Sequence, residues 1–178
     1  ITMKRYVFYI ITILIFLCNV KCTNHVKIGN ILTNADKLVD EFPDSAYVLL
    51  SNINLDEINA KGQKAEYALL LSKAKDKCFI DETDDSIINI AIDYYRDKGC
   101  SSERMKSYYY LGCVQYNARL YPQANISFAL AEKDAVELSD YFYAGLIYRG
   151  IMYIMHHTIT KRSYHMQPNH MTILLKLV

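Results

Sequence analysis

Residues 105–138 of the chain, MKSYYYLGCVQYNARLYPQANISFALAEKDAVEL, decide the fold. Apolar and small side chains recur in this segment at intervals of three and four residues, which is the period of a helix face. Six positions carry the pattern: Tyr108, Leu111, Gly112, Ala124, Phe128 and Ala131. A glycine lets two helices approach closely, alanines keep the crossing tight, and aromatic rings fill the space between layers. The segment therefore predicts two helices packed as an antiparallel hairpin.

The six positions resemble the tetratricopeptide repeat at its large, Leu, Gly, Ala, aromatic and Ala positions. Two positions depart from the family pattern, because Gln115 stands where Tyr is usual and Val136 stands where Pro is usual. The resemblance implies an all-α fold in which antiparallel helical hairpins stack into a solenoid. It also implies a concave groove that binds a peptide or protein. We expect Tyr109 and Gln115 to line that groove, since both lie off the stripe set by Leu111 and Gly112.

Helical periodicity extends on both sides of this segment, and no stretch alternates in period two for long enough to indicate a strand. We expect the first helix to end at Phe42, before Pro43, and the polar stretch 54–63 to contain a turn at Gly62. The expected helices after Pro43 cover residues 46–53, 65–78, 86–98, 103–119, 121–137 and 140–154. Residues 23–154 are thus predicted to form the helical-repeat domain.

Composition and motifs argue against several classes of function. The 178 residues carry 20 Lys and Arg against 19 Asp and Glu, so no polyanion-binding surface is expected, and we predict no nucleic-acid partner. No nucleophile motif or phosphate loop occurs, so we predict no catalytic residues and no cofactor. Four histidines near the C-terminus lack the spacing and the carboxylates of a metal site, so we predict no metal: His156, His157, His165 and His170.

The first 22 residues have the form of a signal peptide. Lys4 and Arg5 precede an apolar stretch at residues 7–17, which is shorter than a membrane-spanning helix. Cys18 and Cys22 follow directly, as in a bacterial lipoprotein signal. We expect lipidation at Cys22, with Cys18 as the alternative, and an envelope protein that faces the periplasm or the exterior. An uncleaved anchor would place the domain on the same side.

Residues 3–151 as a whole resemble helical-repeat lipoproteins of Bacteroidetes, which carry a segment similar to FPDSA at residues 42–46. The resemblance implies a membrane-anchored, non-catalytic module that binds a protein or peptide. The alternative is the N-terminal sensory half of a larger membrane-bound regulator. An all-α lipoprotein enzyme is a third reading, which would need a carboxylate or nucleophile constellation that the sequence does not show.

The composition changes abruptly after Ile151, where histidines cluster and acidic residues are absent. The change falls within an expected first helix of a repeat. We therefore predict that the tail at residues 155–178 is a frameshift product and not a domain, that its histidines have no function, and that the natural protein is longer.

Overall fold

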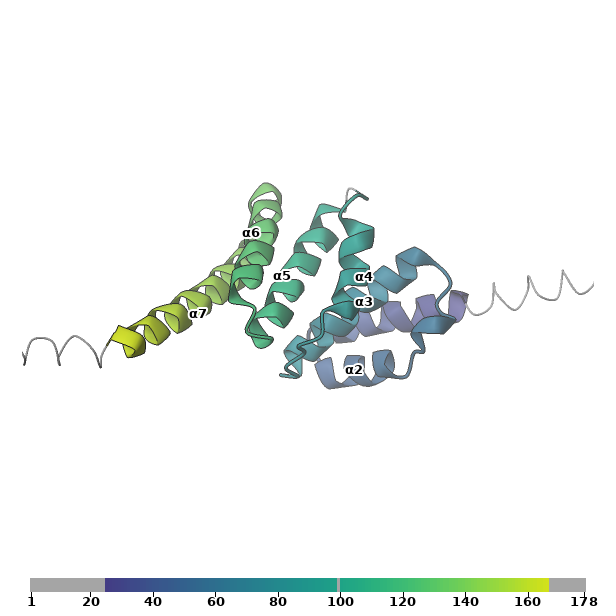
Figure 1. The fold of residues 1–178 in the computed structure, drawn as a ribbon. Coiled ribbons are helices and arrows are strands. Elements are labelled where there is room, and N and C mark those ends of the chain that lie inside the picture. Colours follow the sequence, from purple (N-terminus) through teal and green to yellow (C-terminus); the bar gives the residue numbers. More distant parts are fainter. Residues whose placement is uncertain (1–24, 99, 167–178) are drawn as a thin grey trace, which may run out of the picture. The chain divides into compact units, whose positions relative to one another are not determined.

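The computed structural model of the protein describes residues 25–98 and 100–166, with side chains up to residue 160 (Figure 1). Within these ranges every regular element is helical and no strand occurs, so the prediction of an all-α fold is confirmed. The chain divides into two compact units. Unit 1 contains residues 25–81 and 86–98, and unit 2 contains residues 82–85 and 100–166.

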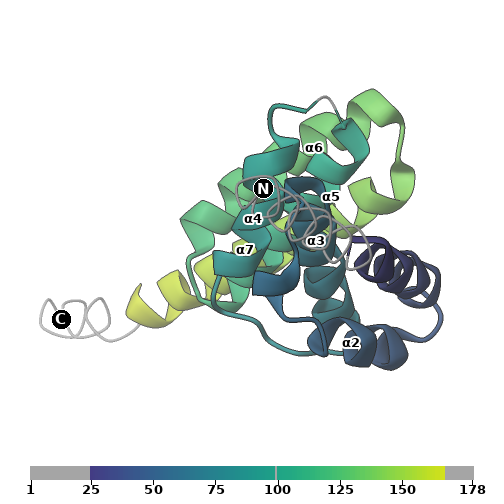
Figure 2. The same ribbon diagram turned by 90° about the vertical axis from the view of Figure 1, so that its right-hand side faces the viewer.

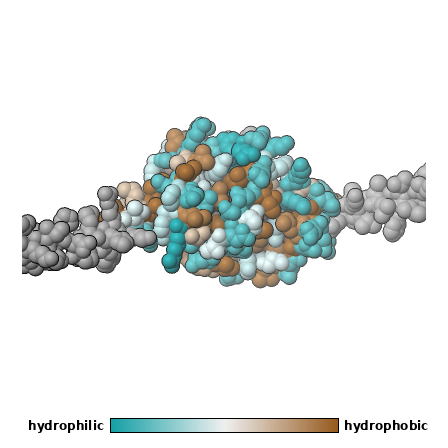
Figure 3. Space-filling view, in the orientation of Figure 1, coloured by the Kyte–Doolittle hydropathy of each residue, from teal (hydrophilic) through white to brown (hydrophobic). Residues whose placement is uncertain are grey.

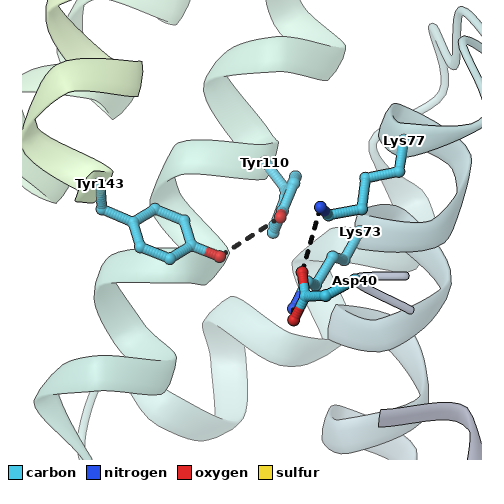
Figure 4. Close-up of polar contacts among 5 residues, drawn as sticks. All are labelled: Asp40, Lys73, Lys77, Tyr110 and Tyr143. Carbon is cyan, nitrogen blue, oxygen red and sulfur yellow. Dashed lines mark hydrogen bonds and ion pairs between the residues drawn. The ribbon is translucent and has the colours of Figure 1, made fainter. Parts of the chain in front are cut away.

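Unit 1 begins with a helix over residues 25–38. It continues with α2 (Pro43–Ser51), the 3-10 helix η1 (Leu55–Glu57), α3 (Lys61–Lys77) and α4 (Ser86–Tyr95). Pro43 starts α2, where its missing N–H costs nothing. The first helix, α2 and α3 bury one apolar cluster, which includes Leu32, Val39, Leu50 and Leu70. Asp40 lies 2.9 Å from the Lys73 ammonium and 3.1 Å from that of Lys77 at the edge of this unit (Figure 4).

The prediction of a turn at Gly62 is wrong, because α3 begins at Lys61 and Gly62 lies in its first turn. The chain reverses earlier, at η1, where the Asn54 side chain accepts a hydrogen bond from the Asp56 N–H at 3.0 Å. A Cβ at Gly62 would lie 3.1 Å from the Tyr94 hydroxyl of α4. This glycine therefore permits a close contact between two helices.

Unit 2 consists of the hairpin formed by α5 (Ser101–Asn117) and α6 (Tyr121–Leu138), followed by α7 (Tyr141–Met166) (Figures 1 and 2). The helices are joined by residues 118–120 and 139–140. Helix α7 packs against both α6 and α5. It extends well past the predicted end at residue 154, since no Pro or Gly interrupts residues 151–166.

Helices α3, α5 and α6 end in the same way, with a left-handed residue other than glycine: Phe79, Arg119 and Ser139. After α3, the Ile80 N–H donates to the Lys75 carbonyl and the Phe79 N–H donates to that of Asp76. This pair of bonds is the Schellman motif, which satisfies the last carbonyls of a helix.

No helix among residues 25–98 and 100–166 has both the length and the hydropathy needed to cross a membrane. The predicted signal peptide at residues 1–22, with Cys18 and Cys22, lies outside the described residues. The same holds for His170 and for the side chain of His165.

Candidate functional site

The centre of unit 2 is the ring of Phe128 on α6, which is only 2% exposed. A Cβ built on Gly112 of α5 would lie 2.6 Å from Cε1 of this ring, and one built on Gly150 of α7 would lie 2.7 Å from its Cζ. Real Cβ atoms essentially never approach so closely, so both helices need glycine where they meet Phe128. The ring thus joins α6 to both of its neighbours in unit 2.

Most of the predicted packing residues lie in the core, and Gly112 is the one that meets this ring. Leu111, Gly112, Ala124, Phe128 and Ala131 are all buried. The sequence analysis missed Gly150. No signal in the sequence separates it from Gly145, which lies in the same apolar helix and meets no atom.

The assignment of faces on α5 was wrong for Tyr109. Tyr109 is 3% exposed, and its ring centroid lies 6.0 Å from that of Phe128 and 5.6 Å from that of Tyr143. Tyr108, which was expected to pack between repeats, is only partly buried. The buried face of α5 includes Met105, Tyr109 and Gly112. Helix α7 packs against α5 in addition to α6, and the sequence pattern of the α5–α6 hairpin does not indicate this third helix.

Gln115 is partly buried, and its Oε1 accepts a hydrogen bond of 2.7 Å from the Ser127 hydroxyl of α6. The Ser127 side chain is buried, so the glutamine satisfies a polar group within the hairpin. This contact accounts for a polar residue at the position where the repeat family has Tyr. The expected groove contact of Gln115 remains a prediction.

Two further polar contacts hold unit 2 together. The Arg104 guanidinium donates two hydrogen bonds, of 2.7 and 2.6 Å, to the carboxylate of Asp134, which is buried. These bonds raise the pKa of Arg104 above its ordinary value. The hydroxyls of Tyr110 and Tyr143 lie 3.3 Å apart in the core (Figure 4). Helices α5, α6 and α7 are therefore linked by specific polar geometry as well as by apolar packing.

Helix α7 buries one face and exposes another that is also apolar. Tyr143, Ile147 and Ile154 are buried. Large apolar side chains elsewhere on the helix are more than half exposed: Tyr141, Phe142, Tyr148, Met152, Tyr153 and Ile159. Apolar residues also lie among polar ones on the face shown in Figure 3. A row of exposed apolar side chains on one helix typically marks an interaction surface, and it is the candidate functional site of this unit.

No group of three or more His, Cys, Asp and Glu residues in the described part of the chain is placed to hold a metal ion. Of the tail histidines, His157 contacts Tyr121 of α6, with ring centroids 4.6 Å apart and ring planes tilted by 40°.

Comparison of the chain with known protein families, curated proteins and solved structures finds no match.

Proposed function

We propose that the chain is a non-catalytic protein–protein interaction module, built as a solenoid of tetratricopeptide-like hairpins. The observation that carries the proposal is the position of Phe128 between Gly112 and Gly150, which joins α7 to the preceding hairpin through the same ring that joins α5 to α6. A packing relation in which each helix docks on the previous hairpin can be repeated, and its repetition generates a solenoid.

In this proposal a peptide or protein segment binds along the concave surface that the first helices of the hairpins line. Gln115 of α5 is the contact residue, because its Oε1 accepts the hydrogen bond from Ser127 and its Nε2 amide group can donate to a backbone carbonyl of the partner. Tyr109 has no part in this binding, since its ring is buried against Phe128.

The proposal places the module in the cell envelope, held at a membrane by a lipid on Cys22. The support is the order of a basic start, an apolar stretch at residues 7–17 and a cysteine. Labelling of cells with a fatty-acid analogue should mark the parent chain and not the Cys22→Ala variant. Labelling that persists in Cys22→Ala would contradict lipidation at this residue.

Site-specific crosslinking tests the binding function. A photoreactive amino acid at position 115 is expected to crosslink a distinct protein in native membranes. The same amino acid at position 126 serves as the matched control, because Ile126 is exposed on the neighbouring helix α6. Equal crosslinking at both positions, or none at position 115, would contradict the proposed groove.

A further inference from the structure

Three tyrosine rings from three helices contact one another beside the turn between α5 and α6. The ring centroids of Tyr116 on α5 and Tyr121 on α6 lie 5.6 Å apart, with the ring planes tilted by 58°. The ring centroid of Tyr153 on α7 lies 6.5 Å from that of Tyr116. Tyr153 is 56% exposed, and the other two side chains are partly exposed, so the cluster is open to solvent.

Exposure distinguishes this cluster from the other contacts between tyrosine rings in the described part of the chain. Each of those contacts includes a buried side chain: Tyr95, Tyr109, Tyr110 or Tyr143. The chain contains 16 tyrosines and no tryptophan, so the phenol rings are its most readily oxidised aromatic groups. An oxidant in solution therefore meets neighbouring phenol rings most readily at this cluster.

The backbone of the turn fixes the positions of Tyr116 and Tyr121. The Arg119 N–H donates to the Tyr116 carbonyl at 2.9 Å. The Leu120 N–H donates to the Gln115 carbonyl at 2.8 Å. With Arg119 in the left-handed region at a φ of 63°, these bonds form a Schellman motif. The two rings are thus held together before any reaction, which favours a bond between them over a bond between two molecules.

We propose that Tyr116 and Tyr121 form an oxidative modification site, at which a haem peroxidase supplied with hydrogen peroxide joins the two rings as dityrosine. Each phenol loses one electron and its hydroxyl proton, which gives two tyrosyl radicals. A carbon–carbon bond then forms between the positions ortho to the two oxygens. Each ortho hydrogen leaves as a proton, and each oxygen regains one. One hydrogen peroxide takes up the two electrons and two protons and becomes two waters.

The link would join the end of α5 to the start of α6 permanently, because a carbon–carbon bond between two rings is not reversed by reduction. It is separate from the binding function proposed above, and it requires neither a partner nor the groove. Tyr121 is the expected partner of Tyr116, because its ring is nearer than that of Tyr153.

Mass spectrometry of the oxidised full chain tests the proposal. The chain is treated with a haem peroxidase and hydrogen peroxide, and is then digested with trypsin. Cleavage after Arg119 places Tyr116 in the peptide of residues 107–119 and Tyr121 in that of residues 120–133. We expect these two peptides as a linked pair that is two hydrogens lighter than their sum, with fragmentation placing the link at positions 116 and 121.

The variants Tyr116→Phe and Tyr121→Phe should each abolish the linked pair, since phenylalanine keeps the ring and removes the phenol. The matched control is Tyr108→Phe, which removes a hydroxyl from the same tryptic peptide but lies outside the cluster. In this control the linked pair should form as in the parent chain.

Three results would overturn the inference. A linked pair that persists in Tyr116→Phe would show that another tyrosine of α5 reacts. A link that joins residues 107–119 mainly to residues 150–161 would assign the reaction to Tyr153. Linked pairs that combine isotope-labelled with unlabelled peptides, after oxidation of a mixture of the two chains, would show that the bond forms between molecules.

Discussion

Replacement of the two glycines that contact Phe128 tests the packing of unit 2 most directly. The variants are Gly112→Ala and Gly150→Ala, with Gly145→Ala as the control on the same helix as Gly150. A methyl group at position 112 would lie 2.6 Å from Cε1 of the ring, and one at position 150 would lie 2.7 Å from Cζ. Ordinary van der Waals contacts begin near 3.4 Å. The ring or a helix must therefore move by most of an ångström.

The ring has little freedom to make this movement. It is 2% exposed, and its Cζ lies 3.0 Å from a Cβ at Gly112 and 2.7 Å from a Cβ at Gly150, so both helices confine the same end of the ring. Overpacking of this kind costs about 1–3 kcal/mol. Each Gly→Ala change also stabilises its helix by up to about 1 kcal/mol, and this gain is common to all three variants.

The difference from Gly145→Ala therefore isolates the packing cost. We expect Gly145→Ala to be neutral or stabilising, and Gly112→Ala and Gly150→Ala to lie about 1–3 kcal/mol below it in free energy of unfolding. Native-state hydrogen exchange of the α6 amides, measured with increasing urea, reports on unit 2 without interference from unit 1.

The same glycine substitutions can be repeated in a chain that lacks the Phe128 ring. The variant Phe128→Leu removes the ring, so Gly112→Ala in that background should be no worse than Gly145→Ala. Mutational effects usually add to within about 0.5 kcal/mol. If the free energies of unfolding of Gly112→Ala and Gly145→Ala agree within that margin in the parent chain, the ring does not hold α5 and α6 together as described.

Three other perturbations follow from the same structure. Arg104→Met should destabilise unit 2 by about 3 kcal/mol because it leaves the buried Asp134 carboxylate unpaired, and Arg104→Met with Asp134→Leu should recover most of the loss in a urea denaturation series. Burial of Asp40 alone would raise its pKa, but hydrogen bonds and attraction from Lys73 and Lys77 lower it below 3.8. Any stability that Asp40 contributes should therefore be complete above the pKa of the carboxyl in the unfolded chain, and should be lost as the pH falls through its pKa in the folded chain. An NMR titration should show a higher Asp40 pKa in the double variant Lys73→Met, Lys77→Met than in the parent chain. Phe79→Gly should raise the melting temperature, since Phe79 is almost fully exposed at a φ of 56° and glycine relieves about 1 kcal/mol of left-handed strain, whereas a lower melting temperature would show that the ring stabilises unit 1.

The presence of the helices followed from the sequence because local patterns control it, although the first helix ends at residue 38 and not at Phe42, and α7 continues to Met166 and not to residue 154. Periodicity predicted a helix over residues 86–98, and α4 covers Ser86–Tyr95. Pro43 marks the start of α2 because its ring fixes φ and removes a donor, which are properties of the residue itself. The close approach at Gly112 also followed from sequence, since a glycine on an apolar helix face within a hairpin pattern has few other uses.

Only the tertiary structure decided which side of each helix is covered. Tyr108 and Tyr109 are adjacent and chemically identical, yet Tyr109 is buried because α7 approaches α5 from its side. Gly62 resembles a turn residue until the Tyr94 hydroxyl of α4 is found 3.1 Å from its Cβ position. Gly150 and Gly145 cannot be distinguished by their type or local surroundings, but one meets Phe128 and the other meets no atom. Periodicity defines the faces of a helix, whereas the neighbours that cover them come from residues far away in the sequence.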